Sequence, residues 1–228
     1  MLSFSGGKDS TALLLMMLEK GIEPGEIVFF NTGWEFPEML EHIRRVEEYI
    51  GRRIVRLQPE KPFDYWMFEH KLTTKNRCGY GFPTIKSRWC TRIKLDTLTK
   101  FWVKMGKPNF YLGIAYDEQH RIKGRLLKNN KKFPLVDWKI TEKQALQYCY
   151  SRGFDWGGLY NYFRRVSCWC CPFRRLSELR NLRRFYPNLW QRLMEMEERS
   201  WNKFRQDYSV FDLEERFKQE ESQLKLQI

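Results

Sequence analysis

The sequence has no long hydrophobic run, so a membrane-spanning helix is not expected. The longest apolar stretch, residues 11–18, is shorter than the roughly 18 residues that a span requires. A secretory signal is also missing, because Met1 leads directly into a loop of glycine and serine rather than into a basic and then apolar segment. Internal repeats and low-complexity segments are absent as well. These absences predict a cytoplasmic protein without a membrane partner.

Acidic residues are too few to balance the basic ones. The chain has 41 Lys and Arg against 28 Asp and Glu, which gives a formal net charge of +13. Such an excess repels itself in a folded chain, and an anionic partner is the usual compensation. Nucleic acid and phosphorylated small molecules are the candidate classes, although a basic surface without a partner has the same composition. With 42% hydrophobic residues, the chain can still bury a core.

Short apolar runs alternate with helical patterns through most of the chain. Strands are predicted at residues 2–4, 27–30, 54–57 and 111–114, and helices at 11–20, 37–50 and 141–151. This alternation requires crossovers, so we expect an α/β fold with a doubly wound, mostly parallel sheet. The composition changes after Gly157-Gly158, which predicts one domain over residues 1–158 and a helical, basic, cysteine-containing region over 159–228. The tail from Ser177 to Phe217 is expected to form one or two helices, interrupted at Pro187.

A glycine-rich loop, Ser5-Gly6-Gly7-Lys8-Asp9-Ser10, lies between the first strand and the first helix. Adjacent glycines let the backbone approach a bulky anion, and the start of a helix favours phosphate oxygens. Lys8 adds a positive charge, whereas Asp9 is expected to order the loop or to reach Mg²⁺. An ordinary turn is the alternative interpretation. Ligands of parallel sheets bind at the carboxyl ends of the strands. The predicted binding residues therefore also include Ser3, Phe4, Asn31, Thr32 and Gly33.

The same loop resembles the PP-loop signature of the adenine nucleotide alpha-hydrolase superfamily, and four further segments narrow the resemblance to the phosphoadenosine-phosphosulfate reductase family. These segments are Phe30 to Glu38, Arg88 to Lys94, Leu112 to Arg121 and Phe133 to Trp138. Asn31 stands where the family motif has Asp, and Ala115 and Gln119 are further departures. The spacing of a Walker loop is not present. The resemblance implies that ATP and Mg²⁺ bind at the loop, with Lys8, Asp9, Lys94 and Arg121 as candidate catalytic residues.

Within that family the reductases use a cysteine in a C-terminal E-C-G-x-H segment, which this sequence does not contain. Other relatives adenylate a target with ATP, release pyrophosphate and replace AMP by sulfur. The resemblance therefore favours an ATP-dependent sulfur transferase. A sulfonucleotide reductase with a nonstandard thiol and a nucleic-acid-binding protein without turnover are the two alternatives. Pyrophosphate release from ATP would separate the first hypothesis from the other two.

Cys168 and Cys171 form a C-x-x-C pair followed by Pro172, and this segment resembles the iron–sulfur members of the family. The resemblance adds the distant Cys90 as a third ligand. Cys78 is the best candidate for the fourth ligand and Cys170 is the next. Soft thiolates bind iron–sulfur clusters or zinc, so a [4Fe–4S] cluster is expected, with structural zinc or free thiols as alternatives.

A run of arginines between Asn161 and Arg192 suggests a surface for a phosphate backbone. Eight arginines occur there with one acid, Glu178. The aromatic residues Tyr160, Tyr162, Phe163 and Trp169 could stack on bases. The expected partner is DNA or tRNA, together with a cysteine desulfurase or another sulfur donor, and a homodimer is also considered. The alternative is that the arginines pair with the acidic residues that follow Leu193.

Overall fold

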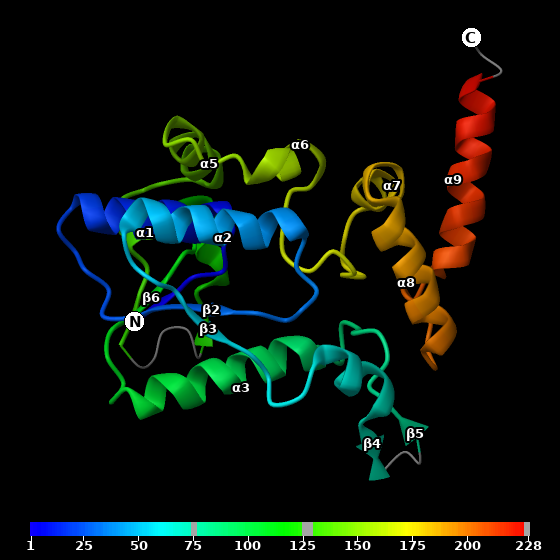
Figure 1. The fold of residues 1–228 in the computed structure, drawn as a ribbon, viewed down its shortest axis with the longest axis horizontal. Helices are drawn as coiled ribbons and strands as arrows, with labels where there is room; N and C mark the ends of the chain where they lie inside the picture. Colours follow the sequence, from blue (N-terminus) through cyan, green and yellow to red (C-terminus); the bar gives the residue numbers. More distant parts are fainter. Residues whose placement is uncertain (74–76, 125–129, 226–228) are drawn as a thin grey trace. The chain divides into compact units, whose positions relative to one another are not determined.

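The computed structural model describes residues 1–73, 77–124 and 130–225, and the chain divides into two compact units (Figure 1). The first unit contains Met1–Pro59 and Lys94–Ser167, and the second contains Glu60–Ile93 and Cys168–Ile228. The boundary predicted after residue 158 thus falls nine residues before the point at which the chain changes unit. The sequence did not predict that an internal segment joins the second unit, because long-range contacts make that connection.

The first unit is built on a five-stranded sheet in which every pairing is parallel. Its strands are β1 Leu2–Ser3, β2 Ile27–Phe30, β3 Val55–Leu57, β6 Phe110–Leu112 and β7 Lys131–Lys132, in the order β3-β2-β1-β6-β7. The short strand β1 is central, since Leu2 is paired with Ile27 on one side and with Tyr111 on the other. The doubly wound, mostly parallel α/β fold is therefore confirmed.

Helices cover both faces of this sheet. The bounds are α1 Lys8–Glu19, α2 Pro37–Ile50, α3 Trp89–Lys104, α4 Pro134–Asp137, α5 Glu142–Ser151 and α6 Leu159–Tyr162, with 3₁₀-helices η3 Tyr116–Arg121 and η5 Trp156–Gly158. Figure 1 shows α3 on the opposite side of the sheet from α1, α2 and α5. Helix α3 begins in the second unit and ends in the first, where Leu98 and Trp102 pack with Met1 and Val28.

Local sequence features account for several of these elements. All four residues of β2 are buried, as a continuous apolar run in a parallel sheet should be. Helix α5 begins after Thr141, whose side chain and that of Gln144 form a capping box. Helix α2 ends at Gly51, which adopts a left-handed conformation with φ of 63°. Helix α1, by contrast, begins at Lys8 rather than at the predicted residue 11, because the glycine loop itself provides the N-cap, Gly7.

The second unit combines a two-stranded antiparallel hairpin with three helices. Its elements are the π-helix η1 Tyr65–Glu69, the strands β4 Lys71–Leu72 and β5 Arg77–Cys78, and the helices α7 Leu176–Phe185, α8 Pro187–Arg199 and α9 Val210–Lys225. Pro187 occupies the first turn of α8, so the predicted interruption is confirmed. The side chain of Asn202 ties the internal segment to the tail: its amide accepts from Phe82 N at 2.8 Å and donates to Phe82 O at 3.0 Å.

In the described ranges, no helix has both the length and the apolar character that crossing a membrane requires.

Candidate functional site

The loop between β1 and α1 has the close backbone approach that a phosphate site needs. Gly6 is left-handed, with φ of 75°, and a Cβ atom there would lie 2.4 Å from the Met39 sulfur. Only glycine fits this position. The hydroxyl of Ser10 closes the loop, because it accepts a hydrogen bond from Ser5 N at 3.1 Å and donates to Gly7 O at 3.0 Å. Gly7 is the N-cap of α1 and has no side chain to cap the helix, so the positive end of the helix dipole faces the loop.

Two aromatic side chains also hold this loop, and the sequence analysis did not assign them to it. The Lys8 backbone N–H donates to the Tyr160 hydroxyl at 2.7 Å. The Trp156 indole N–H donates to Gly6 O, also at 2.7 Å. Tyr160 was expected to stack on nucleic-acid bases, and the structure instead places its hydroxyl at the start of α1. Burial raises the pKa of Tyr160, so this hydroxyl stays protonated.

The carboxyl end of β1, at Ser3, leads through Phe4 into the loop. Phe4 N donates to Val28 O, in β2, at 2.8 Å. The binding roles of Ser3, Phe4 and the segment Asn31–Gly33 stay predictions. After β2, the side chain of Glu35 accepts from the backbone N–H of Thr32 at 3.2 Å and of Gly33 at 3.0 Å. Glu35 therefore fixes the segment Asn31–Gly33, a role that the sequence analysis did not assign to it.

The strand on the other side, β6, also comes close to the loop. A Cβ atom at Gly113 would lie 2.9 Å from the backbone nitrogen of Ser10. A side chain there would push the start of α1 away from the sheet, so this glycine permits close packing.

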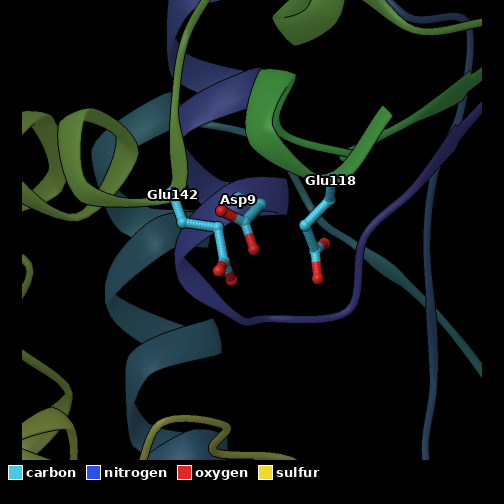
Figure 2. Close-up of side chains that lie close together, drawn as sticks. All are labelled: Asp9, Glu118 and Glu142. Atoms are coloured by element: carbon cyan, nitrogen blue, oxygen red, sulfur yellow. The ribbon is translucent and has the colours of Figure 1, made fainter. Parts of the chain in front are cut away.

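Three carboxylates meet next to the loop: Asp9 from α1, Glu118 from η3 and Glu142 from α5. One oxygen from each lies within 4.8 Å of the others. Figure 2 shows the three side chains directed toward the same space. The hydrogen bond from Glu142 N to Asp117 Oδ1, 3.0 Å long, brings the start of α5 against η3. Of the three acids, the sequence analysis identified only Asp9, because the other two come from distant elements.

The three carboxylates of Asp9, Glu118 and Glu142 together favour the binding of positive charge. Lys8 Nζ contacts Glu142 Oε1 at 2.6 Å and Asp9 Oδ2 at 3.2 Å. Asp9 Oδ1 is buried and has no hydrogen-bond partner among the described residues. Burial raises the pKa of Asp9 to about 6, and the positive charge of Lys8 opposes this shift. The donor set, three carboxylates with one oxygen unsatisfied, fits Mg²⁺, a hard cation that prefers oxygen ligands.

Arg121 and Lys94 were the other two candidate catalytic residues. Arg121 ends η3, is exposed and forms an ion pair with Glu118. It therefore lies at the carboxylate group, on the side of Glu118. Lys94 is half-buried on α3, and the contacts of the described residues do not connect it with the loop. The role predicted for Lys94 stays a prediction.

The thiols that the sequence singled out lie in the second unit. Cys90 is in the first turn of α3, and Cys171 is close enough for its charge to affect the titration of Cys90. Cys168 and Cys171 affect the buried Cys170 in the same way. Cys78 is exposed on β5, and no contact of the described residues connects it with these four thiols. Cys170 therefore lies near Cys168 and Cys171, and the choice of Cys78 or Cys170 as the fourth ligand stays a prediction.

Arg174 organises the turn that carries these cysteines. Its buried guanidinium donates to Cys168 O at 3.0 Å and to Trp169 O at 3.2 Å, and it lies 3.6 Å from the carboxylate of Glu178. The sequence analysis had placed Arg174 on a nucleic-acid-binding face. The structure instead gives it a role in shaping the backbone around Cys168 and Cys171.

The cysteine group suits a soft metal by its chemistry. Burial raises the pKa of Cys90 and of Cys170, so each thiol stays protonated until a metal or a positive charge stabilises the thiolate. In the part of the chain that the structure describes, no three sulfurs lie within 4.8 Å of one another.

The arginine run largely pairs with acids, as the alternative interpretation of the sequence proposed. On α7, Arg180 bonds Glu220 at 2.7 Å, and Arg183 bonds Glu214 at 2.8 Å and Glu221 at 2.6 Å. All three acids belong to α9. Two of the expected stacking residues are core residues, because Phe163 and Trp169 are each only 1% exposed. Helix α7 is thus a weaker candidate for a phosphate-binding face than its composition suggests.

Comparison with known proteins gives matches over most of the chain. The family model described as "Phosphoadenosine phosphosulfate reductase domain" matches residues 1–174. An uncharacterised protein of Methanocaldococcus jannaschii is 31% identical over 211 residues, which is 84% of this chain and 40% of the relative. A second uncharacterised protein of that organism is 26% identical over 207 residues, or 85% of this chain and 46% of the relative. The chain spans less than half the length of these curated relatives.

Proposed function

Since the chain belongs to the phosphoadenosine phosphosulfate reductase domain family, we propose that it uses this family's nucleotide loop to bind Mg²⁺-ATP and to adenylate a target, into which sulfur is then transferred. The observation that carries this proposal is the carboxylate group of Asp9, Glu118 and Glu142 beside the loop. A divalent cation next to a phosphate-binding loop suits a triphosphate, whose charge must be neutralised. The phosphosulfate group of an adenylyl sulfate, the substrate of the reductases, carries less negative charge than a triphosphate chain.

The residues of the first unit have complementary tasks in this proposal. Asp9, Glu118 and Glu142 would hold Mg²⁺, which would neutralise the polyphosphate and stabilise charge on the leaving pyrophosphate. Lys8 pairs with two of these acids, and binding of the cation would free its ammonium group for a phosphate oxygen. Arg121, exposed beside Glu118, is placed to meet the substrate. Positioning and charge stabilisation are the main demands of such a reaction.

The cysteine group supports the second half of the proposal, sulfur transfer. Cys90, Cys168 and Cys171, with Cys170 or Cys78 as the fourth ligand, would hold a [4Fe–4S] cluster, with zinc as the alternative, and a cluster would supply a site for sulfur. Arg174 holds the backbone of the Cys168–Cys171 turn through its hydrogen bonds to two carbonyls. A cysteine desulfurase or another donor would deliver the sulfur.

The positive charge supports nucleic acid as the target class. Residues 94–167 carry 15 Lys and Arg against 6 Asp and Glu, an excess of 9 that belongs to the first unit. In the second unit the rings of Trp66, His70 and Tyr80 form a tilted cluster, with centroids 4.6 Å apart between Trp66 and His70 and 5.1 Å apart between His70 and Tyr80. All three rings are half-buried, and their partly exposed faces could contact bases.

The test uses protein prepared without oxygen and ATP labelled at the α-phosphate, with tRNA or single-stranded DNA as the target. We expect pyrophosphate and a labelled, adenylated target to form only when Mg²⁺ and a suitable target are present, and AMP to be released once sulfide is added as the sulfur donor. The variant Asp9→Asn removes a charge from the carboxylate group and should slow this reaction by about 100-fold or more. Asp96→Asn is the matched control, because Asp96 is exposed on α3 and should leave the rate unchanged.

Two results would contradict the proposal. Formation of sulfite from an adenylyl sulfate, without cleavage of ATP, would identify a reductase instead. Salt-dependent binding of oligonucleotides with no ATP cleavage for any target would identify a binding protein. Iron, sulfide and zinc analysis of the same preparation, with a visible absorption spectrum, tests the cysteine group separately.

A further inference from the structure

The hydroxyl of Tyr160 occupies a position that a phosphate oxygen takes in an ordinary nucleotide loop. Lys8 is the first residue of α1, and its backbone N–H is one of the unpaired donors at the helix N-terminus. In this chain that N–H donates to the Tyr160 oxygen at 2.7 Å. A Cβ atom on Gly7 would lie 3.3 Å from the same oxygen, so the hydroxyl sits directly over the loop.

This arrangement leaves the proton of the Tyr160 hydroxyl available. A phenol can accept a hydrogen bond and donate its own proton at the same time. The oxygen accepts from Lys8 N–H, whereas the O–H has no acceptor among the described residues. Accepting a bond at the positive end of a helix polarises the hydroxyl, which makes it a better donor toward an anion.

We propose that Tyr160 is a phosphate-binding residue, whose O–H donates to a phosphate oxygen of the nucleotide held by Ser5–Ser10. This inference rests on the proposed function, because it requires a nucleotide in that loop. Tyr160 would connect the N-terminus of α1 with the nucleotide. The Lys8 N–H donates to the phenol oxygen, and the phenol O–H donates to the phosphate. The ligand class is a nucleoside polyphosphate, and adenosine without phosphates does not use this contact.

Trp156 acts in the same unit as a positioning residue. Its indole N–H holds Gly6 O at 2.7 Å. The C=O of Gly6 and the N–H of Gly7 belong to one planar peptide and point in opposite directions, so fixing the carbonyl also fixes the Gly7 N–H. Trp156 adopts a left-handed conformation, with φ of 53°, and Gly157 and Gly158 follow with φ of 59° and 82°. Tryptophan rarely adopts this conformation. Here the strained turn brings the side chains of both Trp156 and Tyr160 into contact with the nucleotide loop.

The test compares Tyr160→Phe with Tyr162→Phe, a matched control from the same segment. Calorimetric titration measures the affinities for ATP, inorganic tripolyphosphate and adenosine. Tyr160→Phe should weaken ATP and tripolyphosphate by roughly 10- to 100-fold, the effect of losing a hydrogen bond to a charged group, and should leave adenosine unchanged. Tyr162→Phe should change none of the three.

The outcomes separate this inference from the proposed function. If the wild type binds neither ATP nor tripolyphosphate, the proposed function fails and the inference fails with it. If the wild type binds ATP and Tyr160→Phe binds it equally well, only the inference is overturned. An equal loss for ATP and adenosine also overturns it, because Tyr160 would then act only through the fold.

Site-specific incorporation of 3-fluorotyrosine at position 160 keeps the hydroxyl and gives a readout should Tyr160→Phe fail to fold. The fluorine resonance of this residue reports on the surroundings of the phenol. ATP and tripolyphosphate are expected to shift the resonance, while adenosine should not. A resonance that ATP leaves unchanged, in a protein shown to bind ATP, would overturn the inference.

Discussion

His42 is a buried imidazole behind the nucleotide loop, and its surroundings keep it neutral. It is 1% exposed and stacks on Trp156 with a ring separation of 4.3 Å. Its Nε2 shares a hydrogen bond with Thr11 Oγ1 at 3.0 Å, while Nδ1 has no partner among the described residues. Burial, with a smaller contribution from the charge of the nearby Arg45, lowers the pKa of His42 to about 3. Because the ring is neutral in the folded chain, His42 makes the free energy of unfolding depend on pH.

The sign of that dependence follows from linkage. The unfolded chain binds a proton at His42 below about pH 6.5, whereas the folded chain does not until about pH 3. The contribution of the neutral ring to the free energy of unfolding is thus complete above about pH 6.5. It is lost as the pH falls from about 6.5 to about 3. We expect the wild type to lose about 1.4 kcal/mol more per pH unit, below about pH 6.5, than the variant His42→Gln. Urea denaturation from pH 7.5 down to pH 4.5 measures the difference.

His70→Gln provides the control for this experiment, because His70 is only half-buried, unlike His42, and belongs to the second unit. Its pH profile of stability should follow the wild type. Parallel profiles for His42→Gln and the wild type would show that the imidazole is not held neutral in the fold. Asp9 also titrates in this pH range. Because the wild type and His42→Gln both contain Asp9, its contribution cancels in the difference between their stabilities.

At the scale of elements, α7 and α9 are joined by ion pairs as well as by apolar contacts, and the pair of Arg183 with Glu214 is half-buried. Glu214 on α9 accepts from Arg183 Nε at 2.8 Å and from the Trp190 indole N–H at 2.7 Å. The side chains of Arg183 and Glu214 are only 16% and 15% exposed. The hydrogen bond from Arg183 is the main reason that the pKa of Glu214 is lowered, and the contact with Trp190 adds to the effect. One carboxylate therefore satisfies groups on both α7 and α8.

Replacing this carboxylate should destabilise the second unit. Glu214→Ala leaves the Trp190 N–H without its acceptor and leaves the Arg183 guanidinium with Glu221 alone, and we expect a loss of about 1–3 kcal/mol in the free energy of unfolding. The neighbouring Glu215→Ala is the control. Its side chain is 67% exposed and contacts Lys218 at the surface, so its loss should be within about 0.5 kcal/mol. Equal effects of the two substitutions in denaturant titrations would show that Glu214 is not a bridging group.

At the scale of the whole molecule, the net charge of +13 is unevenly distributed. From residue 168 to the end, 12 Lys and Arg face 10 Asp and Glu, and many of them pair with each other, as on α7 and α9. Residues 94–167 carry most of the excess. Any nucleic acid that binds through its backbone should therefore depend on this part of the first unit rather than on the arginines of α7.

Binding of a single-stranded oligonucleotide measured at several salt concentrations tests this distribution. The double variant Lys100→Gln with Lys104→Gln removes two exposed charges from one face of α3. It should weaken binding at low salt and reduce the slope of log K against log salt by about 1 for each lost phosphate contact. The control Arg180→Gln removes a charge already paired with Glu220 and should leave the slope unchanged. If Arg180→Gln reduced the slope and the double variant did not, the binding face would instead include α7.

The sequence by itself determined the features that depend on neighbouring residues. The glycine loop, the buried run of β2, the bounds of α2, the capping box at Thr141 and the break at Pro187 all follow from local backbone preferences and short-range hydrogen bonds. The family also followed from ordered local motifs, and the match over residues 1–174 confirmed it. Such features are encoded within a few consecutive residues, so the sequence alone is enough to predict them.

Only the tertiary structure decided which distant residues share a site. Glu118 and Glu142 join Asp9 because α5 docks on η3, and Tyr160 reaches Lys8 across 152 positions of the chain. The arginines of α7 are neutralised because α9 brings its acids to them, and Arg174 turns inward to the carbonyls around Cys168. Hydrogen bonds and ion pairs act over a few ångströms in space regardless of separation along the chain, so composition alone cannot assign their partners.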